Sequence, residues 1–275
     1  MNVTKAIIMV AGWGTRMLPI TKSIEKCMLP IGTRPVIDFV VRDIVSAGIK
    51  DIYFVVGEQS SQLQSYYRSN IPLNDYLRRK QRSDLLSLVA PMTDVKTHFI
   101  MQPSTGKYGT AVPAAMVNEF VDPSEHVLYM NGDQFFYRED GGSNAADLIR
   151  LVSDSNAEVG LFGNPVAPED VSKFGIIEKD GEDNYVRIVE KPSVEDAPSN
   201  LNNSGFYLFN KEIFELSQSI PVDPKTGEYF IIDVINRYVD SGKKVIVGTV
   251  NGEYMECGSV DGWLRANNRI VGLTS

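Results

Sequence analysis

An apolar run that breaks into a glycine-bearing, basic loop constrains this chain more than any other feature. Ala6-Ile7-Ile8-Met9-Val10 predicts a strand buried on both faces. Gly12-Trp13-Gly14 follows, and two glycines around one residue let the backbone turn sharply and bring its N–H groups close to an anion. The cations of Arg16, Lys22 and Lys26 come next. This is the composition that a phosphate-binding loop requires.

Taken alone, the loop leaves two interpretations open. A lone Gly-x-Gly pair is a weak signal, and many such pairs make only a tight turn. The third glycine of a dinucleotide fingerprint is missing, because Pro19 and its neighbours stand where a helix should begin. No Gly-Lys-Ser/Thr sequence closes the loop, so the Walker pattern is absent as well.

Composition narrows the classes of partner. The 275 residues suffice for one large α/β domain or two small ones. A net charge of −8 argues against a nucleic-acid partner, and no apolar run reaches membrane-spanning length. The two cysteines, Cys27 and Cys257, supply neither a disulfide framework nor a metal cluster. We therefore expect a cytoplasmic protein that binds small molecules.

Hydrophobic periodicity predicts strands alternating with helices, beginning with one right-handed βαβ unit. The predicted strands after the first cover residues 52–56, 95–101, 127–130, 158–163, 174–177, 185–189, 244–250 and 253–255. The predicted helices cover residues 35–47, 62–69, 73–89, 112–118, 144–153, 211–217 and 228–237, with a terminal helix after Trp263. We expect 174–177 and 185–189 to form a hairpin, and 244–250 to pair with 253–255.

Two polar residues follow predicted strands, where an open α/β sheet binds its ligands. Gln102 ends one strand and precedes a glycine-rich run that includes Gly109. A glutamine amide both donates and accepts hydrogen bonds, as the edge of a pyrimidine base requires. Asp133 follows the strand 127–130, and a carboxylate there suits Mg²⁺ if a distant second carboxylate joins it.

The stretch from Lys5 to Pro30 resembles the signature of the sugar-1-phosphate nucleotidylyltransferases. That signature runs Ala-Gly-x-Gly-Thr-Arg, x-x-Pro-x-Thr-Lys and Lys-x-Met-Leu-Pro, and the residues from Ala11 to Pro30 fit it. Within the family the chain looks most like the bacterial UTP–glucose-1-phosphate uridylyltransferases, or UDP-glucose pyrophosphorylases. Glu25 stands where the family usually has proline, and Cys27 where it usually has glutamate.

The resemblance implies an α/β, Rossmann-like fold, the nucleotide-diphospho-sugar transferase fold. Its central sheet would be mixed, mostly parallel and flanked by helices, with a smaller sugar-binding β-rich insertion. Residues 1–275 would form a single domain, with a nucleotide-binding half (1–135) and a sugar-binding and C-terminal half (136–275). Relatives are often dimers or tetramers, so we expect a homo-oligomer.

The resemblance also assigns roles to residues in four separate motifs. The catalytic cations would be Arg16, Lys26 and Lys191. Nucleotide binding would fall to Ala11, Gly12, Gly14, Thr15, Gln102 and Gly109, and sugar binding to Gly175, Glu190, Asn203 and Gly205. Asp133 and Glu256 would hold Mg²⁺. Glu256 replaces the usual aspartate, and its extra methylene moves the carboxylate by roughly 1.5 Å.

The implied reaction transfers a uridylyl group from UTP to glucose 1-phosphate and releases pyrophosphate. It needs positioning and charge neutralisation but no general base, because the attacking phosphate is already ionised. Three alternatives stay open: a thymidylyltransferase that uses dTTP, a non-catalytic sugar-nucleotide sensor, and a dinucleotide-dependent oxidoreductase. The last is disfavoured, because Pro19 and two lysines replace the helix N-terminus that would hold a dinucleotide pyrophosphate.

Overall fold

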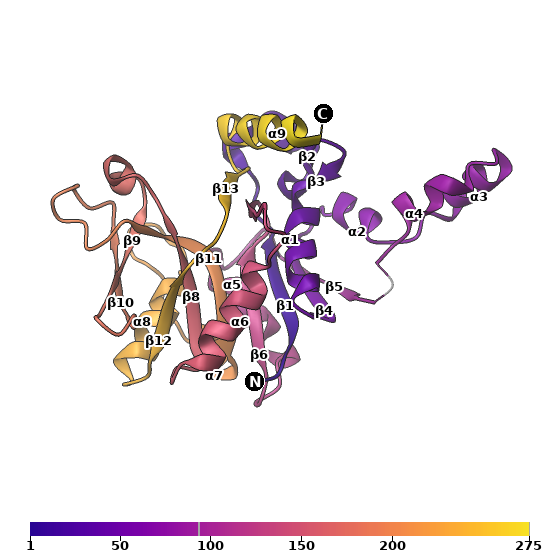
Figure 1. The fold of residues 1–275 in the computed structure, drawn as a ribbon. Coiled ribbons are helices and arrows are strands. Elements are labelled where there is room, and N and C mark those ends of the chain that lie inside the picture. Colours follow the sequence, from indigo (N-terminus) through magenta and orange to yellow (C-terminus); the bar gives the residue numbers. More distant parts are fainter. Residues whose placement is uncertain (93, 275) are drawn as a thin grey trace.

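The computed structural model describes residues 1–92 and 94–274, which build a nine-stranded mixed sheet flanked by helices (Figure 1). The order along the sheet is β10-β9-β11-β6-β1-β4-β5, and β8 pairs with both β11 and β12. The strands of this sheet are β1 (Val3–Val10), β4 (Asp51–Gly57), β5 (Lys96–Gln102), β6 (His126–Asn131), β8 (Val159–Pro165), β9 (Gly175–Lys179), β10 (Tyr185–Glu190), β11 (Leu201–Asn210) and β12 (Val245–Thr249). The predicted mixed, helix-flanked α/β fold is confirmed.

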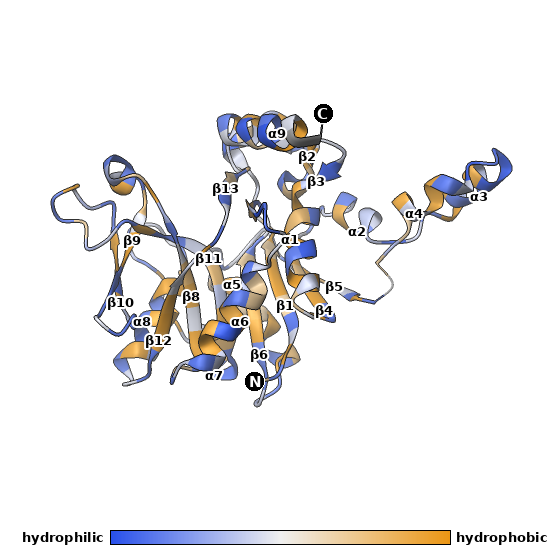
Figure 2. Ribbon diagram, in the orientation of Figure 1, coloured by the Kyte–Doolittle hydropathy of each residue, from blue (hydrophilic) through white to orange (hydrophobic). Residues whose placement is uncertain are grey.

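Strand β1 lies within the parallel part of the sheet, between β4 and β6. Its apolar run is buried on both faces: Ile8 packs into the core on one side and Ile7 into the core on the other. Figure 2 shows the middle of these strands as mainly apolar. Because β1, β4, β5 and β6 all run in one direction, their carboxyl ends meet at one edge of the sheet.

Helices cover both faces of the sheet. The core on one face takes apolar side chains from α1 (Val36–Ser46), α2 (Gln62–Tyr66), α6 (Asn144–Asp154) and α9 (Val260–Thr274). The core on the other face takes them from α5 (Val112–Val117), α7 (Lys211–Ser217) and α8 (Ile231–Asp240). The predicted helix 228–237 corresponds to α8, which begins three residues later, at Ile231. The backbone before α8 is held elsewhere, since Tyr229 donates to the Tyr108 carbonyl and accepts from the Ala111 N–H.

Strands β13 (Glu253–Glu256) and β7 (Gln134–Tyr137) pair as a two-stranded antiparallel ribbon. The sequence pattern did not predict β7. The predicted pairing of 244–250 with 253–255 is wrong, because β12 instead pairs in parallel with β8. A smaller antiparallel pair joins β2 (Pro30–Ile31) to β3 (Arg34–Pro35). The predicted hairpin of β9 and β10 is confirmed.

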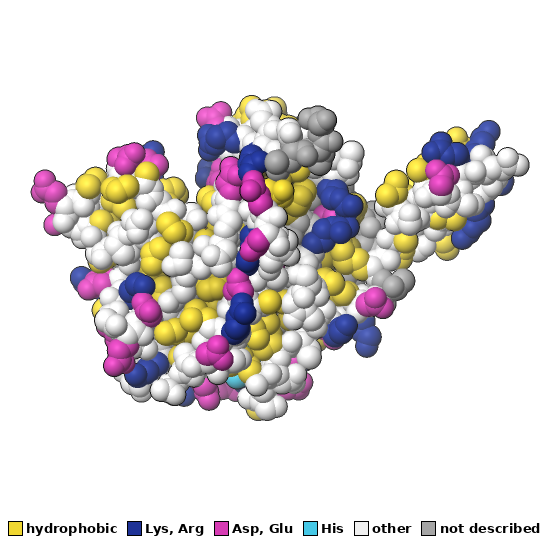
Figure 3. All heavy atoms as spheres, viewed as in Figure 1, with side chains coloured by type: hydrophobic (Ala, Val, Ile, Leu, Met, Phe, Trp, Pro, Cys, Tyr) yellow, Lys and Arg dark blue, Asp and Glu magenta, His cyan; other side chains and the backbone are white. Residues whose placement is uncertain are grey.

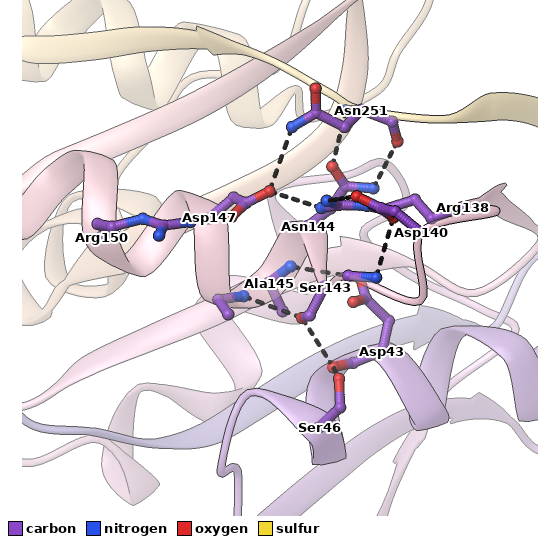
Figure 4. Close-up of polar contacts among 12 residues, drawn as sticks. Asp43, Ser46, Arg138, Asp140, Ser143, Asn144, Ala145, Asp147, Arg150 and Asn251 are labelled. Carbon is purple, nitrogen blue, oxygen red and sulfur yellow. Dashed lines mark hydrogen bonds and ion pairs between the residues drawn. The ribbon is translucent and has the colours of Figure 1, made fainter.

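A polar network fixes the far end of the ribbon to the helices (Figure 4). Arg138, next after β7, donates to the carboxylates of Asp140 and Asp147. Asn251, just before β13, exchanges two hydrogen bonds with Asn144 at the start of α6. The ribbon is thus anchored at the end opposite to Asp133 and Glu256.

An arm of residues 68–92 stands clear of the body of the molecule (Figure 1). The predicted helix 73–89 is broken there into α3 (Ile71–Arg79), a 3-10 turn and α4 (Leu86–Val89). The break follows α3, where Gln81 takes a φ of 57°. Among the described residues, no helix is both long and apolar enough to cross a membrane.

Candidate active site

The signature loop after β1 folds back on itself through short 3-10 turns. Gly14 has a φ of 63°, and a Cβ there would lie 3.0 Å from the Thr21 side chain. Thr21 in turn donates to the Gly14 carbonyl oxygen at 2.9 Å. Met17 and Cys27 are buried in the core and anchor the loop, whereas Thr15 and Arg16 stay exposed.

A cleft at the carboxyl edge of the parallel strands collects residues that the sequence places far apart. Seven of the predicted site residues line it, namely Ala11, Gly12, Gly14, Lys26, Gln102, Gly109 and Asp133. An adjoining cleft shares Ala11, Gly12, Lys26 and Gln102, and extends to Trp13 and to residues 57–62. The structure thus brings the first loop, the strand tip at Gln102 and the acidic turn at Asp133 together at one cleft.

Two cations and two carboxylates converge beside this cleft. The Lys26 ammonium pairs with the Asp133 carboxylate, and its side chain is 13% exposed. Arg16 Nη2 lies 3.8 Å from Glu256 Oε1 and its side chain is 67% exposed, so it stays available to a ligand. A Cβ built on Gly258 would come within 2.6 Å of Glu256 Oε1 and 2.7 Å of Lys26 Nζ, so these groups crowd around one point.

The β7–β13 ribbon brings the two carboxylates together. Glu256 is paired with Gln134, the neighbour of Asp133, and the Cys257 N–H donates to the Asp133 carbonyl at 3.3 Å. Asp133 and Glu256 are 123 positions apart in the sequence. The antiparallel register of β7 against β13 makes them neighbours.

Glycines make room for the longer carboxylate of Glu256. A Cβ on Gly262 would lie 2.1 Å from Glu256 Oε2, a distance that no real side chain tolerates. Ser259 donates its hydroxyl to the same oxygen and fixes the carboxylate. The substitution of glutamate for the expected aspartate is thus accommodated by its own surroundings.

Two buried thiols, those of Cys27 and Cys257, lie near the site. Burial raises the pKa of Cys27 far above its usual range and the pKa of Cys257 to about 12. Neutral, buried thiols are poor nucleophiles and poor metal ligands. Cys27, which stands where the family usually has glutamate, serves as a core residue.

Gln102 and Gly109 define the wall opposite the first loop. Gln102 is almost fully buried at the tip of β5. Gly109 has a φ of 123°, and a Cβ there would lie 2.3 Å from the Tyr229 carbonyl oxygen. Only glycine lets this loop pass so close to the segment before α8.

The predicted sugar-binding residues lie on β9, β10 and β11. A Cβ on Gly175 would lie 2.8 Å from Glu190 Oε2, so the glutamate side chain covers this glycine. Asn203 Nδ2 donates to the Tyr207 hydroxyl at 2.7 Å. Gly205 packs against Asn131, which lines the cleft.

Glu190 and Lys191 are exposed at the end of β10. Among the described residues that line the two clefts there is neither Gly175, Glu190, Lys191 nor Asn203. The structure does not bring these predicted residues into the same cavity as Lys26 and Asp133.

Sequence reasoning missed the wall formed by residues 57–62. This wall could have been found, because β4 ends at Gly57 and the loop after a parallel strand lies at the ligand-binding edge. Glu228, which matches a position of the family pattern at the start of the predicted helix 228–237, also lines the cleft.

Comparison with known proteins gives a consistent result. The nucleotidyl transferase family matches residues 5–271. A UTP–glucose-1-phosphate uridylyltransferase of Streptococcus pneumoniae is 38% identical over 223 residues, covering 78% of this chain and 73% of that protein. One of Haemophilus ducreyi is 32% identical, covering 95% of this chain and 91% of that protein. The UTP-bound UDP-glucose pyrophosphorylase of Acinetobacter baumannii superposes with a TM-score of 0.88 at 28% identity, covering 99% of this chain and 94% of that one.

Proposed function

The chain belongs to the nucleotidyl transferase family, and on that premise we propose that it transfers a uridylyl group from UTP to glucose 1-phosphate, releasing pyrophosphate. The observation that carries the proposal is the convergence of Lys26, Asp133 and Gln102 on one cleft at the carboxyl edge of the parallel strands. Relatives that span most of the chain and are named for this reaction support it.

The chemistry joins two anions, so the site must neutralise charge and hold the reactants in line. A phosphate oxygen of the sugar phosphate attacks the α-phosphorus of UTP, and the bond to the β-phosphate oxygen breaks. Arg16 and Lys26 bind the triphosphate and stabilise the leaving pyrophosphate, while Lys191 binds the incoming phosphate. The backbone of Gly12, Gly14 and Thr15 supplies N–H donors to the same phosphates.

The remaining predicted residues hold the two ends of the reactants. Gln102 and Gly109 bind the uracil edge, beside Ala11. Gly175, Glu190, Asn203 and Gly205 bind the sugar, and we keep the division into a nucleotide half (1–135) and a sugar half (136–275) on this basis. The sugar residues line neither cleft, but Gly205 packs against Asn131, which does line one of them.

The donor set beside Lys26 fits Mg²⁺. Among residues 1–92 and 94–274, no cluster of three or more His, Cys, Asp or Glu could hold a metal alone. Mg²⁺ needs only one or two carboxylates, because substrate phosphates and water complete its shell. Asp133 and Glu256 would hold the ion, which would neutralise charge on the phosphate oxygens.

The decisive experiment measures pyrophosphate release with Mg²⁺ and glucose 1-phosphate, comparing UTP, dTTP, ATP, CTP and GTP. We expect UTP to be the preferred triphosphate. Preference for dTTP would make the protein a thymidylyltransferase. Binding of UTP without any release would support the non-catalytic sensor.

We also propose that the protein is a cytoplasmic homo-oligomer assembled through the arm of residues 68–92. The arm exposes Ile71, Tyr76 and Leu88, the last with 74% of its surface accessible. It carries five Lys or Arg against two Asp, in a chain with a net charge of −8, so it complements the acidic body of a second copy. Figure 3 shows the basic side chains gathered on this arm.

Light scattering tests the assembly. The double substitution of Ile71 and Leu88 by Asp should reduce the mass to that of one chain, whereas Val186→Asp on the β9–β10 hairpin should not. A single-chain mass for the wild type would refute the proposed oligomer.

The two unpaired, buried cysteines support the proposed location in a reducing compartment such as the cytoplasm.

A further inference from the structure

Glu25 ties the signature loop to the start of α2 through a dense set of hydrogen bonds. Its Oε2 accepts from the Ser60 hydroxyl at 2.6 Å. Its Oε1 accepts from the backbone N–H groups of Ser61, at 2.8 Å, and Gln62, at 2.6 Å. A longer bond of 3.3 Å from the Leu63 N–H completes the set. One carboxylate thus satisfies the first N–H groups of α2.

The Gln62 side chain also bonds back to the signature loop. Its side-chain oxygen accepts from the Glu25 N–H at 2.9 Å, and its amide nitrogen donates to the Ser23 carbonyl at 3.1 Å. Ser61, the N-cap residue of α2, makes no side-chain cap bond of its own. The cap of this helix is therefore supplied by a loop 36 residues earlier in the chain.

The clamped loop carries the cations of the site. Lys26 follows Glu25 directly and reaches Asp133. Both sides of the clamp line the same cleft, with Glu25 and Lys26 on one side and Ser60, Ser61 and Gln62 on the other. A shift of the clamp would move Lys26 relative to the acidic turn.

Glu25 has a φ of −58°, close to the value that a proline ring imposes, and an extended ψ of 130°. Proline is the residue that the resemblance predicts at this position. We infer that Glu25 is a positioning residue, which sets by hydrogen bonds to α2 the loop shape that proline would set covalently, and so places Lys26 for the triphosphate. This inference rests on the proposed function.

The test compares Glu25→Ala, Glu25→Pro and Glu25→Gln in steady-state kinetics with UTP and glucose 1-phosphate. Glu25→Ala should lower kcat/KM for UTP by roughly tenfold or more, because Lys26 is no longer held in place. Its KM for glucose 1-phosphate should stay unchanged. Glu25→Pro should recover activity to within about threefold of the wild type although it cannot form the clamp. Glu215→Ala, an exposed carboxylate on α7, is the matched control.

A Glu25→Ala enzyme with unchanged kinetics would overturn the inference. So would a folded Glu25→Pro enzyme that is as slow as Glu25→Ala, since loop shape would then not be what Glu25 supplies. Hydrogen exchange separates this inference from the proposed function. In Glu25→Ala, faster exchange at Ser61–Leu63 and at Lys26–Met28 supports the clamp whatever the substrate, and unchanged exchange refutes it.

Discussion

Lys26 and Asp133 meet in a crowded pocket between the signature loop and a strand end, whereas Glu190 and Lys191 stand exposed at the end of an edge strand. The first pair is held by the Glu25 clamp, the β7–β13 ribbon and the core residues Met17 and Cys27. The second has few constraints beyond the β9–β10 hairpin. The residues around Lys26 and Asp133 are therefore held by more contacts than those around Glu190 and Lys191.

The largest effect should come from Lys26→Ala, which changes the more constrained of the two regions. The substitution removes a cation at the triphosphate and leaves Asp133 without its partner, so kcat should fall by about 10²- to 10³-fold. Pyrophosphate release at saturating UTP measures it. Lys50→Ala, an exposed lysine before β4, is the control. A loss below about fivefold would remove Lys26 from the catalytic set.

The contrast between the two regions predicts that Lys191→Ala changes other kinetic constants than Lys26→Ala does. Loss of Lys191 should raise KM for glucose 1-phosphate and lower kcat/KM by about 30-fold, while the affinity for UTP measured by calorimetry stays unchanged. Exposed Lys173 provides a control near the same hairpin. Weaker UTP binding in Lys191→Ala would mean that the two sides are not separate.

Glu256→Gln should have a smaller effect, visible mainly in the metal dependence. Removing the charge leaves the Ser259 and Arg16 contacts without a carboxylate, so the Mg²⁺ concentration for half-maximal activity should rise about tenfold. A titration of activity against Mg²⁺ measures this shift. An unchanged titration would leave Asp133 as the metal ligand without Glu256.

The smallest effect concerns the anchor of the ribbon and depends on pH. Burial acts against ionisation of Asp147, but Arg138, Asn251 and Arg150 more than offset it and lower its pKa. A lowered pKa stabilises the fold above the unfolded value of about 4, and this stability is lost as the pH falls through the folded value. Asp147→Asn should therefore lower Tm at pH 7, and its difference from the wild type should be smaller near pH 3.

Asp154→Asn, exposed at the end of the same helix, should leave Tm unchanged at both pH values. Thermal melts monitored by circular dichroism make the comparison. Equal melting temperatures for Asp147→Asn and the wild type at pH 7 would show that the network in Figure 4 does not stabilise the ribbon.

Local patterns determined most of the elements of this protein and much of its candidate site. The run from Ala6 to Val10 is apolar on both faces, so it had to be a central strand, and residues after the ends of such strands had to share one edge. Gln102 and Asp133 could be placed there because each follows a strand directly. Pattern reasoning failed at breaks and pairings, as in the arm after Gln81 and in the partner of β13.

Only the tertiary structure decided how distant segments fit one another. The register of β7 against β13 puts Glu256 beside Asp133, and no periodicity in either segment encodes that choice of partner. The room that Gly262 leaves for Glu256 and the cap that Glu25 gives to α2 are likewise contacts across long sequence separations. Side-chain period and turn chemistry are local properties, whereas these contacts depend on which surfaces pack once the sheet is complete.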